Sequence, residues 1–212
     1  MKTTTLLLVL CSFFSVSAGE YNPVLDIEDV APKWEALPAT NGKRIAFDDF
    51  KAKQVLVVVF TCNSCPYAVD YEDRLNAFVK KYTGDSMPVA LVAINVNKVE
   101  EDLLPAMKVR ATEKKFTFPY LFDETQMIAK KFGAGYTPEC FVLNQKREVV
   151  YMGALDDSPD KTKVKVKYLE DAVTAALAVT CSPELRTSTV RVSSVCLHCT
   201  GDYNGVSRHL PP

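Results

Sequence analysis

Two cysteines separated by two residues, Cys62 and Cys65, lie where a long apolar run meets a segment with helical spacing. The apolar run covers residues 55–60, and the helical spacing follows in Tyr71, Leu75, Phe78, Val79 and Tyr82. In this setting a CxxC pair is typical of a redox dithiol rather than of a zinc site. A helix N-terminus carries unpaired N–H groups and a partial positive charge, which stabilise a thiolate and lower its pKa. Since the thiolate is the reactive form, we predict that this pair is redox active.

The segments on either side of this pair alternate between strand and helix patterns. Residues 55–60 and 89–96 are almost entirely apolar runs rich in β-branched residues, as expected for strands buried on both faces of a sheet. Asn41-Gly42 is a tight-turn signal that predicts a hairpin before Asp48-Asp49-Phe50. The remaining expected elements, in chain order, are a helix at 105–115, an extended piece at 118–123, a helix at 124–132 ended by Gly133 and Gly135, strands at 140–143 and 149–152, and a helix at 168–177. This alternation predicts an α/β fold with helices on both faces of a central sheet.

The composition fits one globular domain with a sizeable core. The chain has 212 residues, of which 48% are hydrophobic and 24% are charged. The net charge is −1 and the pI is about 6.2, so no electrostatic footprint for nucleic acid or for an acidic membrane surface is visible. We therefore expect no nucleic-acid partner.

The N-terminus has the pattern of a cleavable export signal. Lys2 is followed by an apolar stretch at residues 6–16 and by a small-residue cleavage pattern, Val16-Ser17-Ala18. The stretch is shorter than the ~20 residues that span a bilayer. Cys11 follows Leu10, which is too large for a lipoprotein signal, so we expect Cys11 to leave with the signal. The predicted organisation is a signal peptide at 1–18, a domain at 20–180 and an irregular cysteine-containing tail at 181–212. We expect an exported protein, periplasmic or secreted, without stable membrane insertion.

A series of short motifs, in order over about residues 25–177, gives the chain a family resemblance. The motifs are Ala31-Pro32 through Phe50 as an entry hairpin, the Cys62–Cys65 corner, Ala93-Ile94-Asn95-Val96-Asn97, Phe116-Thr117-Phe118-Pro119, Asp123, Phe132-Gly133, Tyr136-Thr137-Pro138, Phe141-Val142-Leu143-Asn144 and Gly153. With them the sequence resembles the thioredoxin-fold redoxins, which include thioredoxin-like reductases and the alkyl hydroperoxide reductase/thiol-specific antioxidant (AhpC/TSA) peroxidases. The resemblance implies a thioredoxin-like fold, with a central mixed β-sheet flanked by helices and a redoxin-type N-terminal hairpin.

The resemblance also implies roles for the residues around the dithiol. Pro138 is expected to be cis and to face the two sulfurs, which exposes the backbone of Thr137 to an extended substrate. Cys62, expected to be the more exposed sulfur, would attack a substrate disulfide, and Cys65, expected to be held inside the helix, would resolve the mixed disulfide. Further substrate contacts are expected from the residues beside the sulfurs, Thr61, Asn63, Ser64 and Pro66. The implied partners are protein disulfides or dithiols and a redox protein that donates electrons, with no cofactor and no metal.

Two features of thioredoxins are missing, and other functions stay open. The strand at 55–60 holds no carboxylate to manage the proton of the second cysteine, and Thr61 replaces the tryptophan before the dithiol. The peroxidases of the superfamily have Thr-x-x-Cys-Pro, with the peroxidatic cysteine at the position of Cys65. They also need an arginine where Pro138 stands, and two arginines of the domain are not in obvious reach by sequence, Arg74 and Arg110. The alternatives are a thiol peroxidase with Cys65 peroxidatic and a non-catalytic binding module with a permanent disulfide.

Cys140 is a third cysteine near the expected site. It lies two residues after Pro138, on an expected strand, so alternation places both on the same face of that strand. Cys140 is either a buried cysteine that packs as a small hydrophobic residue or an auxiliary thiol beside the dithiol.

The tail holds a second CxxC pair, Cys196-Leu197-His198-Cys199, without a preceding strand or a following helix. Three interpretations stay open: a structural disulfide within the tail or with Cys181, a shuttle dithiol or resolving thiol for Cys62–Cys65, and a zinc site with His198 or His209. Both histidines of the chain are in the tail, so Cys–His hydrolase chemistry within the domain is not expected.

Overall fold

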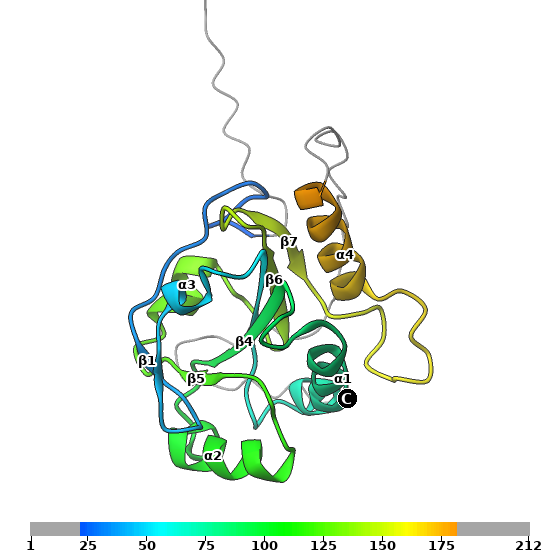
Figure 1. Cartoon of the computed structure of the whole chain (residues 1–212). Coiled ribbons are helices and arrows are strands. Elements are labelled where there is room, and N and C mark those ends of the chain that lie inside the picture. Colours follow the sequence, from blue (N-terminus) through cyan, green and yellow to red (C-terminus); the bar gives the residue numbers. More distant parts are fainter. Residues whose placement is uncertain (1–21, 182–212) are drawn as a thin grey trace, which may run out of the picture.

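An entirely apolar segment, β3 (Val55–Phe60), lies in the middle of a five-stranded sheet. The computed structural model describes residues 22–181, and the six residues of β3 are fully buried in it. The strand pairs in parallel with β4 (Val89–Asn95) and antiparallel with β6 (Glu139–Leu143). The edge strands are β5 (Tyr120–Phe122), parallel to β4, and β7 (Val149–Gly153), antiparallel to β6. The strand order β5-β4-β3-β6-β7 confirms the predicted mixed sheet (Figure 1).

The α-helices of the described residues occur where the sequence predicts them, but their ends differ: α3 begins later than expected and α4 extends further. Their bounds are α1 (Pro66–Tyr82), α2 (Leu104–Glu113), α3 (Met127–Phe132) and α4 (Tyr168–Cys181). The prediction that a helix begins at residue 124 is wrong, because Asp123 closes a turn ahead of α3. Its carboxylate accepts hydrogen bonds from the backbone N–H groups of Thr125 and Ile128, and Gln126 has a left-handed backbone with φ of 61°. Gly133, with φ of 64°, ends α3 as predicted.

The alternation of side chains along β3 divides the core between the two faces of the sheet. The even-numbered residues of β3 share a core with residues of α3 and with aromatic residues of the N-terminal segment, Trp34, Phe47 and Phe50. The odd-numbered residues share the opposite core with residues of α1 and α4 and with Met107 of α2. Figure 1 shows α3 on one side of the sheet and α1 with α4 on the other. The structure therefore has the two covered faces that the α/β pattern predicts.

The N-terminal segment forms the predicted hairpin and then leads into the central strand. Strands β1 (Leu37–Pro38) and β2 (Arg44–Ile45) pair antiparallel around a turn in which Gly42 has φ of 80°. That backbone conformation is open to glycine without steric cost. The short 3-10 helix η1 (Phe47–Phe50) follows and leads into β3.

Several sequence predictions concern residues outside the described range. These are the export signal at 1–18 with Cys11, and the tail beyond α4 with the Cys196–Cys199 pair, His198 and His209. Among the helices of residues 22–181, none combines the length and the apolar character needed to cross a membrane.

Candidate active site

The Cys62–Cys65 pair lies in the loop between β3 and α1, at the carboxyl end of the central strand. Thr61 donates its N–H to the carbonyl of Ile94 at 3.0 Å, which ties the start of the loop to β4. Helix α1 begins at Pro66, so Cys65 is its N-cap residue, with extended backbone angles (φ −77°, ψ 119°). Proline suits the first helical position because an N–H there would have no partner within the helix. The unpaired N–H groups of α1 are therefore next to Cys65 rather than Cys62.

The predicted cis proline faces this loop. The Thr137–Pro138 peptide bond is cis, and β6 begins directly after it, antiparallel to β3. Cys65 Sγ is 3.5 Å from the carbonyl oxygen of Thr137, to which it donates when it is protonated, and Cys62 Sγ is 3.5 Å from Thr137 Oγ1. The structure thus brings both sulfurs against a residue that is 72 and 75 positions away along the chain.

The expected order of exposure of the two sulfurs is wrong. Cys62 is 3% exposed, whereas Cys65 is half-buried. The expectation placed Cys65 inside the helix; because α1 begins one residue later, Cys65 stays at the N-cap, partly open to solvent, and Cys62 lies behind the loop. The expected substrate contacts differ in exposure in the same way: Ser64 and Pro66 are exposed, Asn63 is half-buried and Thr61 is buried.

The surroundings of the two sulfurs favour a thiolate on Cys65. The hydrogen bond from the Cys62 thiol lowers the pKa of Cys65 to about 5, against the opposing effect of burial; Thr137 and two N–H groups in the first turn of α1 lower it as well. The same hydrogen bond, followed by burial and by the negative charge of Asp102, raises the pKa of Cys62. Because the two sulfurs share one hydrogen bond, they titrate as a pair that takes its first negative charge on Cys65.

A buried carboxylate that the sequence analysis did not anticipate lies directly behind the loop. Asp102 ends the short 3-10 helix η2 (Glu100–Asp102), which follows β4, and it has no exposed surface. Asp102 Oδ1 accepts hydrogen bonds from the N–H groups of Asn63 at 2.6 Å and Ser64 at 3.0 Å. Asp102 Oδ2 accepts from the Ser64 hydroxyl at 2.5 Å and from the Asn97 amide at 3.1 Å. The carboxylate missing from β3 is thus supplied after the neighbouring strand, where the sequence has an acidic run.

The side chain of Asn63 strengthens this connection between the loop and its surroundings. Its amide donates to the carbonyl of Glu101 at 2.7 Å, and its Oδ1 accepts from the Tyr120 hydroxyl at 3.1 Å. Asn95 of β4 also donates to the carbonyl of Asp102 at 2.8 Å. The two residues between the cysteines are therefore held by groups of η2 and by Tyr120 at the start of β5.

A second buried carboxylate supports the cis-proline turn from inside. Glu139 is 1% exposed at the start of β6, opposite Phe60 of β3. Glu139 Oε2 accepts a hydrogen bond from the N–H of Gly135 at 2.8 Å. Burial raises the pKa of Glu139 to about 7, while hydrogen bonds from the backbone of Gly135 and Tyr136 act in the opposite direction. The sequence pattern predicts a strand that starts at residue 140, whereas β6 begins one residue earlier and includes Glu139.

Cys140 belongs to the core. It is fully buried on β6, opposite Val59 of β3 and Gly153 of β7, and it packs in the core shared with α1 and α4. Burial raises the pKa of its thiol. These properties favour a cysteine that packs as a small hydrophobic residue over an auxiliary thiol.

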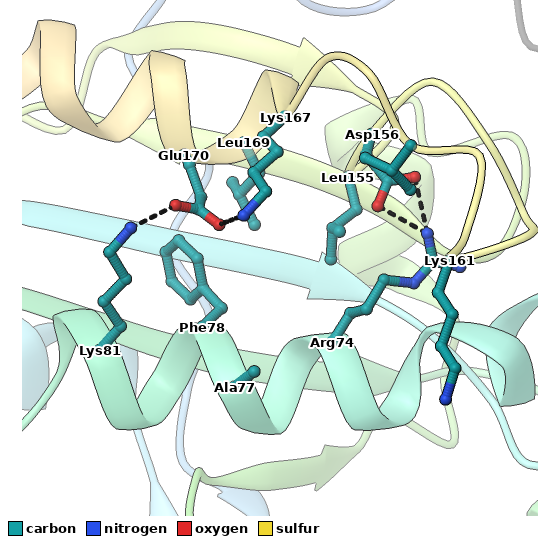
Figure 2. Close-up of a pocket in the computed structure, with 11 residues that line it drawn as sticks. Arg74, Ala77, Phe78, Lys81, Leu155, Asp156, Lys161, Lys167, Leu169 and Glu170 are labelled. Carbon is teal, nitrogen blue, oxygen red and sulfur yellow. Dashed lines mark hydrogen bonds and ion pairs between the residues drawn. The ribbon is translucent and has the colours of Figure 1, made fainter.

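Residues 22–181 contain four arginines, Arg44, Arg74, Arg110 and Arg147. All four make their hydrogen bonds away from the dithiol. Arg74 binds Asp156 at 2.6 Å beside a cavity of about 310 Å³ between α1 and α4. Figure 2 shows this pair reaching from α1 to the loop that precedes α4. Arg110 binds Glu72 through two hydrogen bonds. Within the described residues, then, Cys65 has no arginine partner of the kind that the peroxidases need.

No group of three or more His, Cys, Asp or Glu side chains within residues 22–181 is arranged to hold a metal ion. The zinc interpretation involves His198 and His209, which lie outside this range.

The sequence and the fold are similar to those of known proteins. The profile of the AhpC/TSA family matches residues 27–152. A hypothetical protein from Sinorhizobium meliloti 1021 has 32% identity and a TM-score of 0.67, over 73% of this chain and 85% of its own. An uncharacterized conserved protein from Geobacillus kaustophilus has 33% identity and a TM-score of 0.64, over 73% and 81%. A candidate thiol:disulfide interchange protein, DsbE, from Chlorobium tepidum shares the fold at 22% identity and a TM-score of 0.54, over 72% and 99%. Among curated proteins, none has a matching sequence.

Proposed function

The chain belongs to the AhpC/TSA family and has a thioredoxin-like α/β fold, and from this premise we propose that it is a thiol–disulfide oxidoreductase whose redox centre is the Cys62–Cys65 pair. The observation that carries the proposal is the contact of both sulfurs with Thr137, at 3.5 Å each, beside the cis bond to Pro138. A free dithiol next to a turn whose backbone can pair with an extended chain suits a substrate that presents a disulfide in a peptide segment.

The proposed reaction transfers two electrons from the dithiol to a substrate disulfide. A thiolate of the pair attacks one substrate sulfur, the substrate S–S bond breaks, and the other substrate sulfur leaves as a thiolate that takes up a proton. The second cysteine then attacks the mixed disulfide, which closes the Cys62–Cys65 disulfide and releases the second substrate thiol. A partner redox protein returns the two electrons by the same exchange in reverse.

The substrates in this proposal are protein disulfides, or dithiols if the pair works as an oxidant. We propose that the protein acts after export, since residues 1–18 have the pattern of a cleavable signal and disulfides persist in oxidising compartments. No cofactor is part of the proposed cycle.

The experiment that tests this function compares Cys62→Ser and Cys65→Ser with the wild type in the reduction of a disulfide-bonded protein such as insulin. The wild type should turn over, and both variants should lose turnover because neither can close the intramolecular disulfide. The variant that keeps the attacking cysteine should also accumulate a mixed disulfide, visible on a non-reducing gel.

Cys140→Ala is the matched control, because it removes a cysteine that is buried in the core beside β3. It should retain turnover. If neither serine variant traps a partner and the wild-type dithiol resists reduction, the oxidoreductase function is wrong and a non-catalytic binding module is favoured.

A thiol peroxidase is the second candidate, and the state of Cys65 favours it. Cys65 is partly exposed, precedes Pro66 as in the peroxidases, and has a pKa lowered to about 5 by its hydrogen bond with Cys62. The arginines within residues 22–181 form hydrogen bonds away from Cys65, so none of them stands beside it as the peroxidases require, and this argues against a peroxidase. In this case Cys62→Ser should consume one equivalent of peroxide and leave a sulfenic acid on Cys65, detected by mass spectrometry after dimedone labelling. Peroxide consumption no faster than that of a free thiol would dismiss this candidate.

A further inference from the structure

The carboxylate of Asp102 is held mainly by the loop that carries the two cysteines. It receives hydrogen bonds from both N–H groups between the cysteines, from the Ser64 hydroxyl and from Asn97, all between 2.5 and 3.1 Å. This set of donors satisfies both oxygens of an ionised carboxylate. A full negative charge is therefore placed behind the CxxC loop, in a position without solvent contact.

Ser64 connects this charge to Cys62. Its hydroxyl oxygen is 2.5 Å from Asp102 Oδ2 and 3.9 Å from Cys62 Sγ. A hydroxyl has one proton to donate, and the short contact with a charged oxygen is the stronger of the two. The lone pairs of the Ser64 oxygen are then left to accept a proton from the Cys62 thiol.

The two sulfurs consequently have opposite electrostatic surroundings. Cys62 is buried on the side of the Asp102 charge, and Cys65 is partly exposed at the N-cap of α1, next to unpaired N–H groups. We propose that Asp102, acting through Ser64, is a positioning residue that keeps the negative charge of the reduced dithiol on Cys65, so that Cys65 attacks the substrate and Cys62 resolves. This inference rests on the proposed oxidoreductase function and reverses the roles expected from the sequence.

The chemical steps follow from this placement of charge. The Cys65 thiolate attacks the substrate disulfide and forms a Cys65–substrate disulfide, while the leaving substrate thiolate takes a proton from solvent. The Cys62 thiol then loses the thiolate that accepted its hydrogen bond. Two hydroxyl oxygens remain beside it, Thr137 Oγ1 at 3.5 Å and Ser64 Oγ at 3.9 Å, and of these Ser64 is the one bonded to a carboxylate. As Cys62 attacks Cys65, its proton moves to Ser64, the Ser64 proton moves to Asp102, and the second substrate sulfur leaves as a thiolate. Two electrons have passed from the dithiol to the substrate.

The other titratable groups around the loop do not compete for this role. Tyr120 donates its hydroxyl to Asn63, and burial raises its pKa, so it stays neutral. Glu72 and Arg110, on α1 and α2, form an ion pair at 2.6 Å. The side chains that precede Asp102 in η2, Glu100 and Glu101, are exposed to solvent.

The test labels the reduced protein with a brief pulse of iodoacetamide at about pH 6, where a cysteine reacts only if its thiolate is formed. Fragment-ion mass spectrometry then assigns the label to Cys62 or Cys65. In the wild type, Cys65 should be labelled in at least about tenfold excess, which corresponds to a difference of one pKa unit or more. Asp102→Asn, which keeps the shape and removes the charge, should bring the ratio towards one. Labelling of Cys62 first, or an unchanged ratio in Asp102→Asn, would overturn the proposal.

Asp123→Asn is the matched control. It removes another buried carboxylate that accepts backbone hydrogen bonds, at the turn before α3, and it should leave the labelling ratio unchanged. A change as large as that in Asp102→Asn would show that the ratio responds to any loss of a buried charge and would count against the proposal.

Ser64→Ala tests separately the connection from Asp102 through Ser64 to Cys62. It also tests the proposal if Asp102→Asn does not fold, as judged by circular dichroism. It removes the hydroxyl and keeps the backbone hydrogen bonds to Asp102. The mixed disulfide on Cys65 should persist longer than in the wild type because the proton of Cys62 has lost its route to Asp102; an unchanged lifetime would contradict the proposed path. A wild-type protein that is labelled first on Cys65 but reduces no protein disulfide would support the charge placement and overturn the oxidoreductase function.

Discussion

Replacing Glu139 by glutamine should stabilise the protein at neutral pH and leave its stability at acidic pH nearly unchanged. Glu139 is 1% exposed beneath the cis-proline turn, and its Oε2 accepts a hydrogen bond from the N–H of Gly135. Glutamine has nearly the same shape and an oxygen that can accept the same bond, but it has no charge to bury. The variant therefore isolates the cost of ionising this group inside the protein.

The magnitude follows from the pKa of Glu139, which burial raises from 4.5 to about 7. The folded protein binds this proton more tightly than the unfolded chain, so the stabilisation from the protonated form is complete below pH 4.5. It is lost progressively as the pH rises to about 7 and stays lost above that value. Since one pKa unit corresponds to about 1.4 kcal/mol, the loss is about 3 kcal/mol. Glu139→Gln should avoid it.

Urea unfolding of the reduced wild type and of Glu139→Gln, at several pH values from about 4 to about 8, measures this difference directly. The free energy of unfolding of the variant should exceed that of the wild type by up to about 3 kcal/mol at the upper end, with the gap closing towards the lower end. Glu124→Gln, which removes a charge from an exposed residue in the turn before α3, should stay within about 0.5 kcal/mol of the wild type. A constant offset between Glu139→Gln and the wild type over this pH range would refute the reasoning.

Two further substitutions test the packing that positions the site. Arg74→Ala leaves Asp156, whose side chain is 2% exposed, without its cation, and should lower the free energy of unfolding by about 3–5 kcal/mol in urea denaturation. Arg74→Met combined with Asp156→Leu removes both charges and should recover most of that loss. An equal loss in the double variant would contradict this account. Gly133→Ala would place a Cβ atom 2.1 Å from Asn22 Oδ1 at a residue with φ of 64°. It should lower the free energy of unfolding, measured by thermal denaturation, by at least about 1 kcal/mol. Gly135→Ala, where a Cβ atom meets nothing within 4 Å, should be tolerated, and equal effects of the two substitutions would be inconsistent with the steric argument.

The parts of the fold that were predictable from the sequence are those encoded in short, continuous patterns. The apolar run at 55–60 predicts a central strand because a strand buried on both faces needs no polar side chain, and it is the central strand. The resemblance to the redoxins, carried by short motifs such as Tyr136-Thr137-Pro138, implies a cis Pro138 opposite the dithiol, and the structure confirms the cis bond. Both signals are complete within a few residues.

The features that were not predictable depend on how separate segments meet. Asp102 is one acidic residue in an acidic run, and only the docking of η2 against the CxxC loop distinguishes it from its exposed neighbours. The exposure of the two cysteines depends on whether α1 begins before or after Cys65, a difference of one residue that composition does not determine. Electrostatic roles within the site therefore required the three-dimensional structure.

The N-terminal segment also protects the edges of the sheet. Its residues bridge to both sides: Val30 pairs with Glu148 just before β7, and Ala39 pairs with Leu121 of β5, supported by a hydrogen bond from Thr40 to the carbonyl of Tyr120. Unpaired backbone groups along an edge strand readily recruit strands from other molecules, which leads to aggregation. By occupying hydrogen-bonding positions at both edges, residues 30–40 leave fewer unpaired backbone groups there for a strand of another molecule to pair with, whatever the state of the thiols.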